Sequence, residues 1–85
     1  MVALKKYENK KIAIYGMGIT GRSAAKTFKR LKSNVYCWDD SQKIRKKIKA
    51  LNYDISKFWL NKIAVDSIVI SPGIDINNCK IKNFL

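Results

Sequence analysis

The sequence contains no histidine, and this absence excludes much hydrolytic chemistry. Without an imidazole the chain cannot build a Ser-His-Asp or Cys-His pair, and it lacks the commonest protein ligand for transition metals. The only cysteines, Cys37 and Cys79, lie far apart and have no C-x-x-C spacing, so neither a zinc site nor a redox pair is indicated. We therefore expect a reduced, cytoplasmic protein.

Long apolar runs are missing as well. The longest are only a few residues, and the N-terminus Met-Val-Ala-Leu-Lys-Lys has no apolar signal segment, so we expect neither export nor a membrane partner. Acidic residues are scarce: six Asp and Glu face 18 Lys and Arg, for a net charge of +12. Such a charge attracts phosphates and other anions, but Lys, Asn and Ile share A- and T-rich codons, so the charge alone does not select a ligand.

The chain is short. Its 85 residues are enough for one small domain, and the 47% apolar composition supports a modest core. We therefore expect residues 1–85 to form a single domain.

Short apolar runs alternate with helical patterns along the sequence. The runs Lys11–Tyr15, Val35–Trp38 and Ser67–Ser71 are typical of strands buried in a parallel sheet. Between them, two amphipathic helices with basic outer faces are indicated by the apolar positions Ala24, Ala25, Phe28 and Leu31, and by Ile44, Ile48 and Leu51. Strands that alternate with helices predict an α/β, Rossmann-like three-layer domain with a small parallel sheet.

Local signals set the ends of these elements. Ser33-Asn34 is expected to end the first helix, Asp40 or Ser41 to cap the second, and Asn52 to stop it. Ser56–Leu60 is predicted to form a short helical turn.

A glycine motif, Gly16-Met17-Gly18-Ile19-Thr20-Gly21, matches G-x-G-x-x-G between the first strand and the first helix. Gly16 permits the tight turn, Gly18 lets the backbone approach a pyrophosphate, and Gly21 allows close helix–strand packing. The helix N-terminus then offers N–H groups and a positive dipole end to phosphate, and Thr20 adds a hydroxyl.

The same stretch nearly matches a Walker loop, with Arg22-Ser23 in place of Lys-Ser. We reject this interpretation because a planar guanidinium does not replace the compact lysine ammonium at the phosphates.

Two further groups follow strands, at the edge where strand carboxyl ends line a ligand crevice. Asp39 lies 23 residues after Gly16, close to the offset of roughly 20 residues at which a Rossmann acid meets a ribose. Asp40 and Ser41 follow it, and Ser71-Pro72-Gly73 closes the third strand. The simpler hypotheses for these residues are a helix cap and a strand stop.

Together, Gly16 to Ser23, Trp38-Asp39-Asp40-Ser41 and Ser71-Pro72-Gly73-Ile74 resemble the N-terminal domain of the Mur ligases over essentially the entire chain. The branch that adds D-glutamate to UDP-N-acetylmuramoyl-L-alanine is the better fit, since L-alanine-adding members usually have a doubled glycine and a different tripeptide in place of Ser-Pro-Gly.

The resemblance implies a cytoplasmic three-domain enzyme of peptidoglycan synthesis that forms an amide bond through an acyl phosphate, using ATP and Mg²⁺. Its N-terminal domain holds the UDP of the substrate. By position, Ile19 and Thr20 would meet the diphosphate, Asp39, Asp40 and Ser41 the uridine side, and Ser71, Pro72 and Gly73 the nucleotide rim. Ser41 stands where some members have an arginine, which leaves a uracil-stacking contact open.

The chain has no counterpart of the ATP-binding and C-terminal ligase domains that the resemblance implies. We expect a domain without its last strand, non-catalytic by itself, with no cofactor of its own and an uncovered sheet edge open to self-association. The alternatives are a free-standing NAD-binding or sensor module and, on charge alone, a nucleic-acid-binding module. The lack of interleaved aromatics or a recognised motif disfavours nucleic acid.

Overall fold

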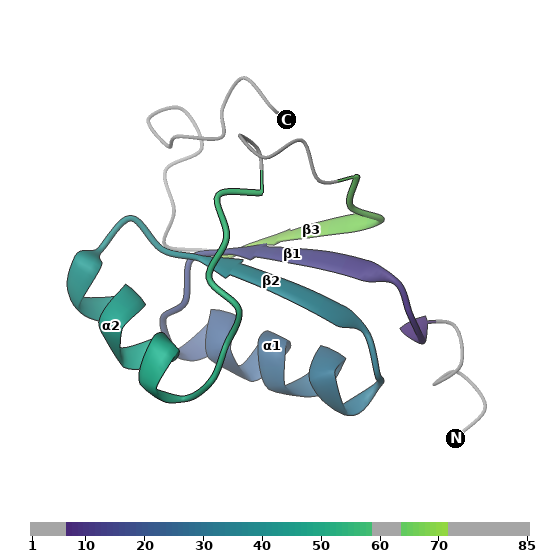
Figure 1. The fold of residues 1–85 in the computed structure, drawn as a ribbon, viewed down its shortest axis with the longest axis horizontal. Helices are drawn as coiled ribbons and strands as arrows, with labels where there is room; N and C mark the ends of the chain where they lie inside the picture. Colours follow the sequence, from purple (N-terminus) through teal and green to yellow (C-terminus); the bar gives the residue numbers. More distant parts are fainter. Residues whose placement is uncertain (1–6, 59–63, 72–85) are drawn as a thin grey trace.

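The computed structural model describes residues 7–58 and 64–71, and five elements lie within them (Figure 1). In chain order these are β1 (Lys11–Tyr15), α1 (Ile19–Arg30), β2 (Asn34–Trp38), α2 (Gln42–Ala50) and β3 (Ser67–Ile70). All three strands are parallel, in the order β2-β1-β3. The predicted α/β, Rossmann-like arrangement with a small parallel sheet is confirmed.

The central strand β1 is buried on both faces, as its continuous apolar run predicts. Ile12 and Ile14 point to one face of the sheet, where they pack with residues of both helices. Ala13 and Tyr15 point to the opposite face. Because β1 is the central strand and its side chains alternate between the faces, it contributes to the hydrophobic cluster on each face of the sheet.

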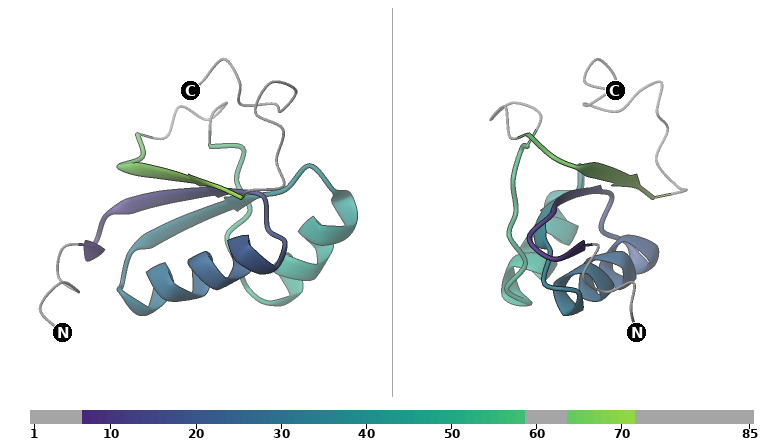
Figure 2. Two further views of the ribbon diagram at one scale, coloured as in Figure 1. Left: turned by 180° about the vertical axis from the view of Figure 1, so that it is seen from behind. Right: turned by 90° about the vertical axis from the view of Figure 1, so that its right-hand side faces the viewer.

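Both helices cover the same face of the sheet (Figure 2). Ala25 of α1 and Ile48 of α2 are fully buried against it. On the opposite face Phe58 is buried beside Tyr15 and Trp38. Within residues 7–58 and 64–71, this second face is therefore covered by the chain around Phe58 and not by a helix.

The helix ends follow most of the predicted signals. Ser41 caps α2 by accepting a hydrogen bond from the Ile44 N–H, and Asn52 adopts a left-handed φ of 65° after the helix ends. The expectation that Leu51 completes the apolar stripe is wrong: α2 ends at Ala50, and Leu51 is 52% exposed.

The turn after α1 also differs from the sequence expectation. Lys32 makes the left-handed turn, with a φ of 62°, and Asn34 is already the first residue of β2. The chain therefore turns slightly before the predicted Ser33-Asn34 break.

The segment after α2 runs beside the free edge of β2. Ile55 forms an isolated parallel bridge with Cys37, whose N–H donates to the Asp54 carbonyl and whose carbonyl accepts from the Ser56 N–H. Of the predicted Ser56–Leu60 helical turn, Ser56 and Lys57 have no regular secondary structure and Phe58 lies in a turn, while residues 59 and 60 lie outside the described residues.

The strand order creates a topological switch beside β1. The chain leaves β1 toward β2 on one side and returns to β3 on the other, so the carboxyl ends of β1 and β3 are adjacent. Open α/β sheets bind ligands in the crevice at such a point. The glycine motif follows β1 and Ser71 follows β3, so both lie at this edge. The expected absence of a last strand concerns residues after Ser71, outside the described residues.

Candidate functional site

The glycine motif turns sharply at the end of β1. Gly16 has a φ of 99°, a left-handed conformation that favours glycine, and its N–H donates to the Trp38 carbonyl at 2.7 Å. This bond extends the β1–β2 pairing into the loop, so the turn begins at a fixed place beside the end of β2.

Gly21 lets α1 pack directly against this turn. A Cβ built on Gly21 would overlap the carbonyl oxygen of Gly16 and lie 3.1 Å from the Ser71 hydroxyl oxygen. The Ser71 hydroxyl itself donates to the Gly16 carbonyl at 2.7 Å. The first and third glycines therefore have the turning and packing roles that the motif predicts, and Ser71 ties β3 to the same carbonyl.

Gly18, in contrast, faces open space. No heavy atom lies within 4 Å of a Cβ built on it. Gly18 is the N-cap of α1, and no side chain caps this helix end. The first turn contains no acidic residue, whereas Lys29 and Arg30 occupy the last turn. The positive dipole end of α1 is thus accessible, as phosphate binding requires.

Two predicted diphosphate contacts begin this helix. Ile19 is 82% exposed and Thr20 is exposed. Their N–H groups, at the start of the helix, have no intrahelical acceptor, and no described backbone hydrogen bond uses them. The loop therefore offers two donors at the switch point.

Asp39 lies at the predicted edge, but its carboxylate faces the protein. One oxygen accepts from the Met17 N–H at 2.7 Å and the other from the Ser41 N–H at 2.8 Å. The residue is only 9% exposed. The structure thus gives Asp39 a role in fixing the glycine loop against the start of α2, and a contact with a ribose stays a prediction.

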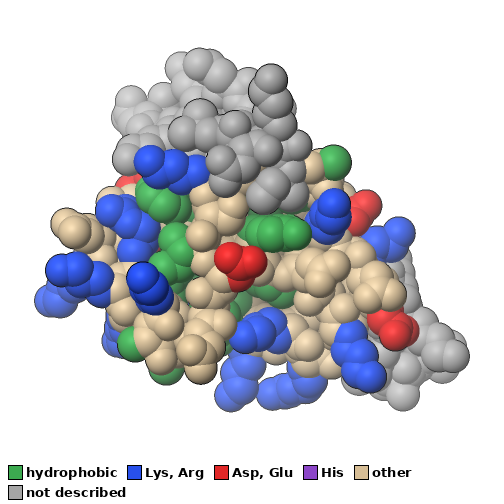
Figure 3. Space-filling view, viewed as in Figure 1, with side chains coloured by type: hydrophobic (Ala, Val, Ile, Leu, Met, Phe, Trp, Pro, Cys, Tyr) green, Lys and Arg blue, Asp and Glu red, His purple; other side chains and the backbone are tan. Residues whose placement is uncertain are grey.

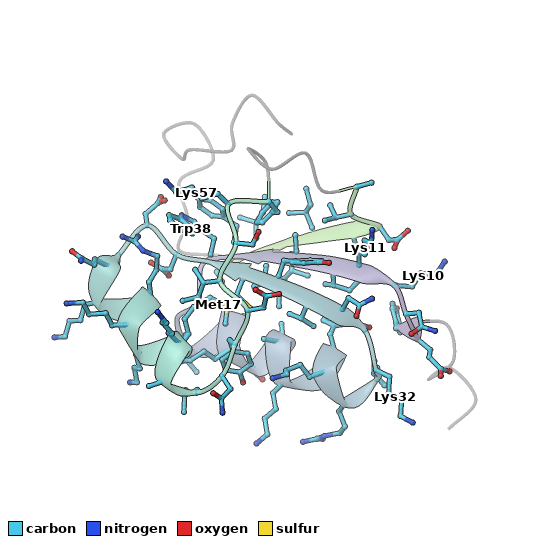
Figure 4. All side chains as sticks on the ribbon, in the orientation of Figure 1. Lys10, Lys11, Met17, Lys32, Trp38 and Lys57 are labelled. Atoms are coloured by element: carbon cyan, nitrogen blue, oxygen red, sulfur yellow. The ribbon has the colours of Figure 1, made fainter. Side chains whose placement is uncertain are left out.

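Asp40 is held by aromatic side chains on the opposite side of the sheet. Its carboxylate accepts from the Tyr15 hydroxyl at 2.6 Å and from the Trp38 indole N–H at 3.1 Å. The Arg45 guanidinium stacks over Trp38 at 4.5 Å and donates to the Asp39 carbonyl. Lys57 lies over the same ring at 5.5 Å (Figure 4). Asp40 is therefore part of a charged cluster around Trp38.

The structure brings the glycine motif, Asp39 to Ser41 and Ser71 together at one edge of the sheet, whereas Pro72 and Gly73 lie outside the described residues.

The sequence pattern did not indicate that three cationic side chains lie beside the loop, because it placed them on the basic outer faces of the helices. Arg22 lies just after the last glycine of the motif, and Lys43 and Lys47 lie on α2. The sequence did contain a signal for them, because Arg22 directly follows the glycine motif and Lys43 lies shortly after the end of β2.

The ATP and Mg²⁺ that the resemblance implies find no matching site in the described part of the chain. It contains no group of three or more His, Cys, Asp or Glu side chains that could hold a metal ion. Arg22 also stands where a phosphate-binding loop requires lysine. Neither described helix is long and apolar enough to cross a membrane.

Cys37 is buried in the core and free. Burial, with a smaller contribution from the charge of Asp54, raises the pKa of its thiol from 9.0 to about 12. The thiol therefore stays protonated and unreactive at neutral pH, which agrees with a structural role.

Comparison with known proteins finds a matching family and relatives over most of the chain. Residues 10–85 match the family described as Mur ligase MurD-like, N-terminal domain. Two relatives are UDP-N-acetylmuramoylalanine–D-glutamate ligases: one of Wolbachia pipientis wMel, 31% identical over 84% of this chain, and one of Wolbachia sp. subsp. Brugia malayi (strain TRS), 27% identical over 87%. The matched regions span only 14% and 16% of those relatives. Because the family match covers nearly all of the sequence, the chain belongs to the MurD-like N-terminal domain family of the Mur ligases.

Proposed function

We propose that this chain binds the UDP moiety of UDP-N-acetylmuramoyl-L-alanine, as the substrate-holding part of a ligase that adds D-glutamate in peptidoglycan synthesis. The names of both relatives support this substrate. The observation that carries the proposal is the N-terminus of α1, which is uncapped by a side chain, free of acidic residues and open at Gly18. A diphosphate placed there would accept from the N–H groups of Ile19 and Thr20.

Asp39 argues against the alternative, an NAD site. A Rossmann acid binds the ribose hydroxyls with its carboxylate, but both oxygens of Asp39 already accept backbone N–H bonds, and the residue is nearly buried. The proposed nucleotide site therefore depends on the loop backbone more than on this carboxylate. We propose no cofactor for the chain itself.

A thermal unfolding experiment tests the proposal. Ligand at about 100 times its Kd adds about 2.7 kcal/mol to the stability of the folded state, so UDP-N-acetylmuramoyl-L-alanine should raise the Tm clearly. N-acetylmuramoyl-L-alanine without the nucleotide is the matched control and should leave the Tm unchanged. Stabilisation by NAD but not by the UDP compound would overturn the proposal in favour of a dinucleotide module.

A further inference from the structure

A basic hollow lies between the N-terminal part of α1 and the side of α2. Its volume is about 340 Å³, and the described residues of its lining include three cationic side chains and no acidic one. The lining residues are Met17, Arg22, Ser41, Lys43, Ile44 and Lys47. Figure 3 shows that Lys and Arg side chains also gather elsewhere over α2 and along α1.

The three cations of the hollow have no acidic partner within residues 7–58 and 64–71. None of Arg22, Lys43 and Lys47 makes a side-chain hydrogen bond or ion pair with another described residue. Arg45, on the same helix, differs, because its guanidinium donates to the Asp39 carbonyl and stacks on Trp38. Like charges placed around a concave surface repel each other, and a bound anion would relieve that repulsion.

The basic hollow lies where the ribose of a bound nucleotide would be expected. It begins at Met17, beside the proposed phosphate position at Gly18, and reaches Ser41 and Lys43 beyond the end of β2. In Rossmann domains, groups after the second strand read the ribose 2′ position, where an acid accepts a hydroxyl and a basic group accommodates a phosphate. Here the acid Asp39 is engaged with the backbone, and cations line the hollow.

We propose that the basic hollow binds a phosphate monoester carried on the ribose of a nucleotide whose 5′-phosphate lies at the N-terminus of α1. This inference rests on the proposed phosphate position at α1 but goes beyond the UDP-sugar, which has no phosphate on its ribose 2′ or 3′ hydroxyl. The chain then has a second class of ligand, ribose-phosphorylated nucleotides, which compete with the UDP-sugar for the glycine loop.

ADP and its two bisphosphate isomers provide a test at constant atomic composition. Titration calorimetry compares adenosine 2′,5′-bisphosphate and adenosine 3′,5′-bisphosphate with adenosine 5′-diphosphate. We expect at least one bisphosphate to bind about tenfold more tightly than the 5′-diphosphate, with an affinity that falls as salt increases. Equal or weaker binding of both bisphosphates would overturn the inference.

Paired variants localise the effect. Lys43→Gln combined with Lys47→Gln should remove the preference for the bisphosphate, whereas Lys46→Gln combined with Lys49→Gln, on the same helix and with the same net charge, should retain it. An equal loss in both pairs would contradict a specific site in the hollow. Binding of UDP-N-acetylmuramoyl-L-alanine without any bisphosphate preference overturns only this inference, whereas a bisphosphate preference without UDP-sugar binding overturns only the proposed function.

Discussion

The Asp39 carboxylate accepts a buried hydrogen bond of 2.7 Å from the Met17 N–H, which joins the end of β2 to the glycine loop that follows β1. Its second oxygen accepts from the Ser41 N–H at the start of α2. One side chain thus fixes the two segments that border the proposed nucleotide site. The sequence pattern predicts that Asp39 contacts the ligand. In the structure, Asp39 instead fixes the loop in which that ligand would lie.

Asp39→Asn should destabilise the fold. An asparagine has one acceptor oxygen, so its amide NH₂ would face one of the two backbone N–H groups, and a lost buried hydrogen bond costs about 1–3 kcal/mol. Chemical denaturation measures the loss. Asp54→Asn, at an exposed position, is the control and should change stability by less than about 0.5 kcal/mol. Equal stability of the two variants would refute the structural role of Asp39.

Gly21→Ala and Gly18→Ala should separate folding from binding. A methyl at Gly21 would overlap the backbone of Gly16, so we expect a loss of about 2 kcal/mol or more. Gly18 has an ordinary φ of −68° and open space around it, so alanine there should cost less than about 1 kcal/mol. The Gly18 variant should nevertheless bind the UDP compound more weakly, because its methyl occupies the approach of the diphosphate. A folded Gly18→Ala protein with unchanged affinity would argue against this approach.

Arg45→Lys should weaken the charged cluster around Trp38 although the charge is kept. Lysine lacks the planar guanidinium that stacks on the ring at 4.5 Å and donates to the Asp39 carbonyl at 2.8 Å. We expect a loss of about 0.5–1 kcal/mol in denaturant unfolding. Lys46→Arg, an exposed substitution on the same helix, should be neutral. If the two variants were indistinguishable, the stacking would contribute nothing to stability.

The Cys37 thiol should make stability fall at alkaline pH. Burial raises its pKa from 9.0 to about 12, so the folded state favours the neutral thiol. This contribution is fully present below pH 9.0 and is lost as the pH rises from 9.0 toward 12. The measurement is the free energy of unfolding of the wild type and of Cys37→Ala across this window. Lysine and tyrosine titrations affect both proteins alike, so the free energy of unfolding should fall more in the wild type than in Cys37→Ala. Parallel pH profiles would exclude the effect.

The strands, helices and glycine turn could be predicted from the sequence because each has a local cause. The apolar run of β1 leaves no exposed face, and Gly16 and Gly21 have the turning and packing roles set by their spacing. The short pairing of Ile55 with Cys37 is different: the alternation of Tyr53, Asp54, Ile55 and Ser56 is compatible with a strand, but the sequence does not show that only Ile55 pairs with β2.

Side-chain directions at the site could not be predicted in the same way. An aspartate at the end of a strand can face the crevice or the protein, and for Asp39 the choice depends on the Met17 N–H, which lies far away in sequence. Lys43 and Lys47 have the spacing of a solvated helix face, and only the packing of α2 beside α1 places them with Arg22 around the basic hollow. Leu51 was assigned to the core because its spacing fits, but the helix ends before it.

The most direct test of the account is an NMR titration of the ¹⁵N-labelled chain with UDP-N-acetylmuramoyl-L-alanine. If the diphosphate binds at the start of α1, the amide signals of Gly18, Ile19 and Thr20 should shift in a saturable manner, while those of Lys32 and Asn52, in the turns after the two helices, should stay in place. Shifts confined to other regions, or none at millimolar ligand, would contradict the assignment of this chain as a UDP-binding domain.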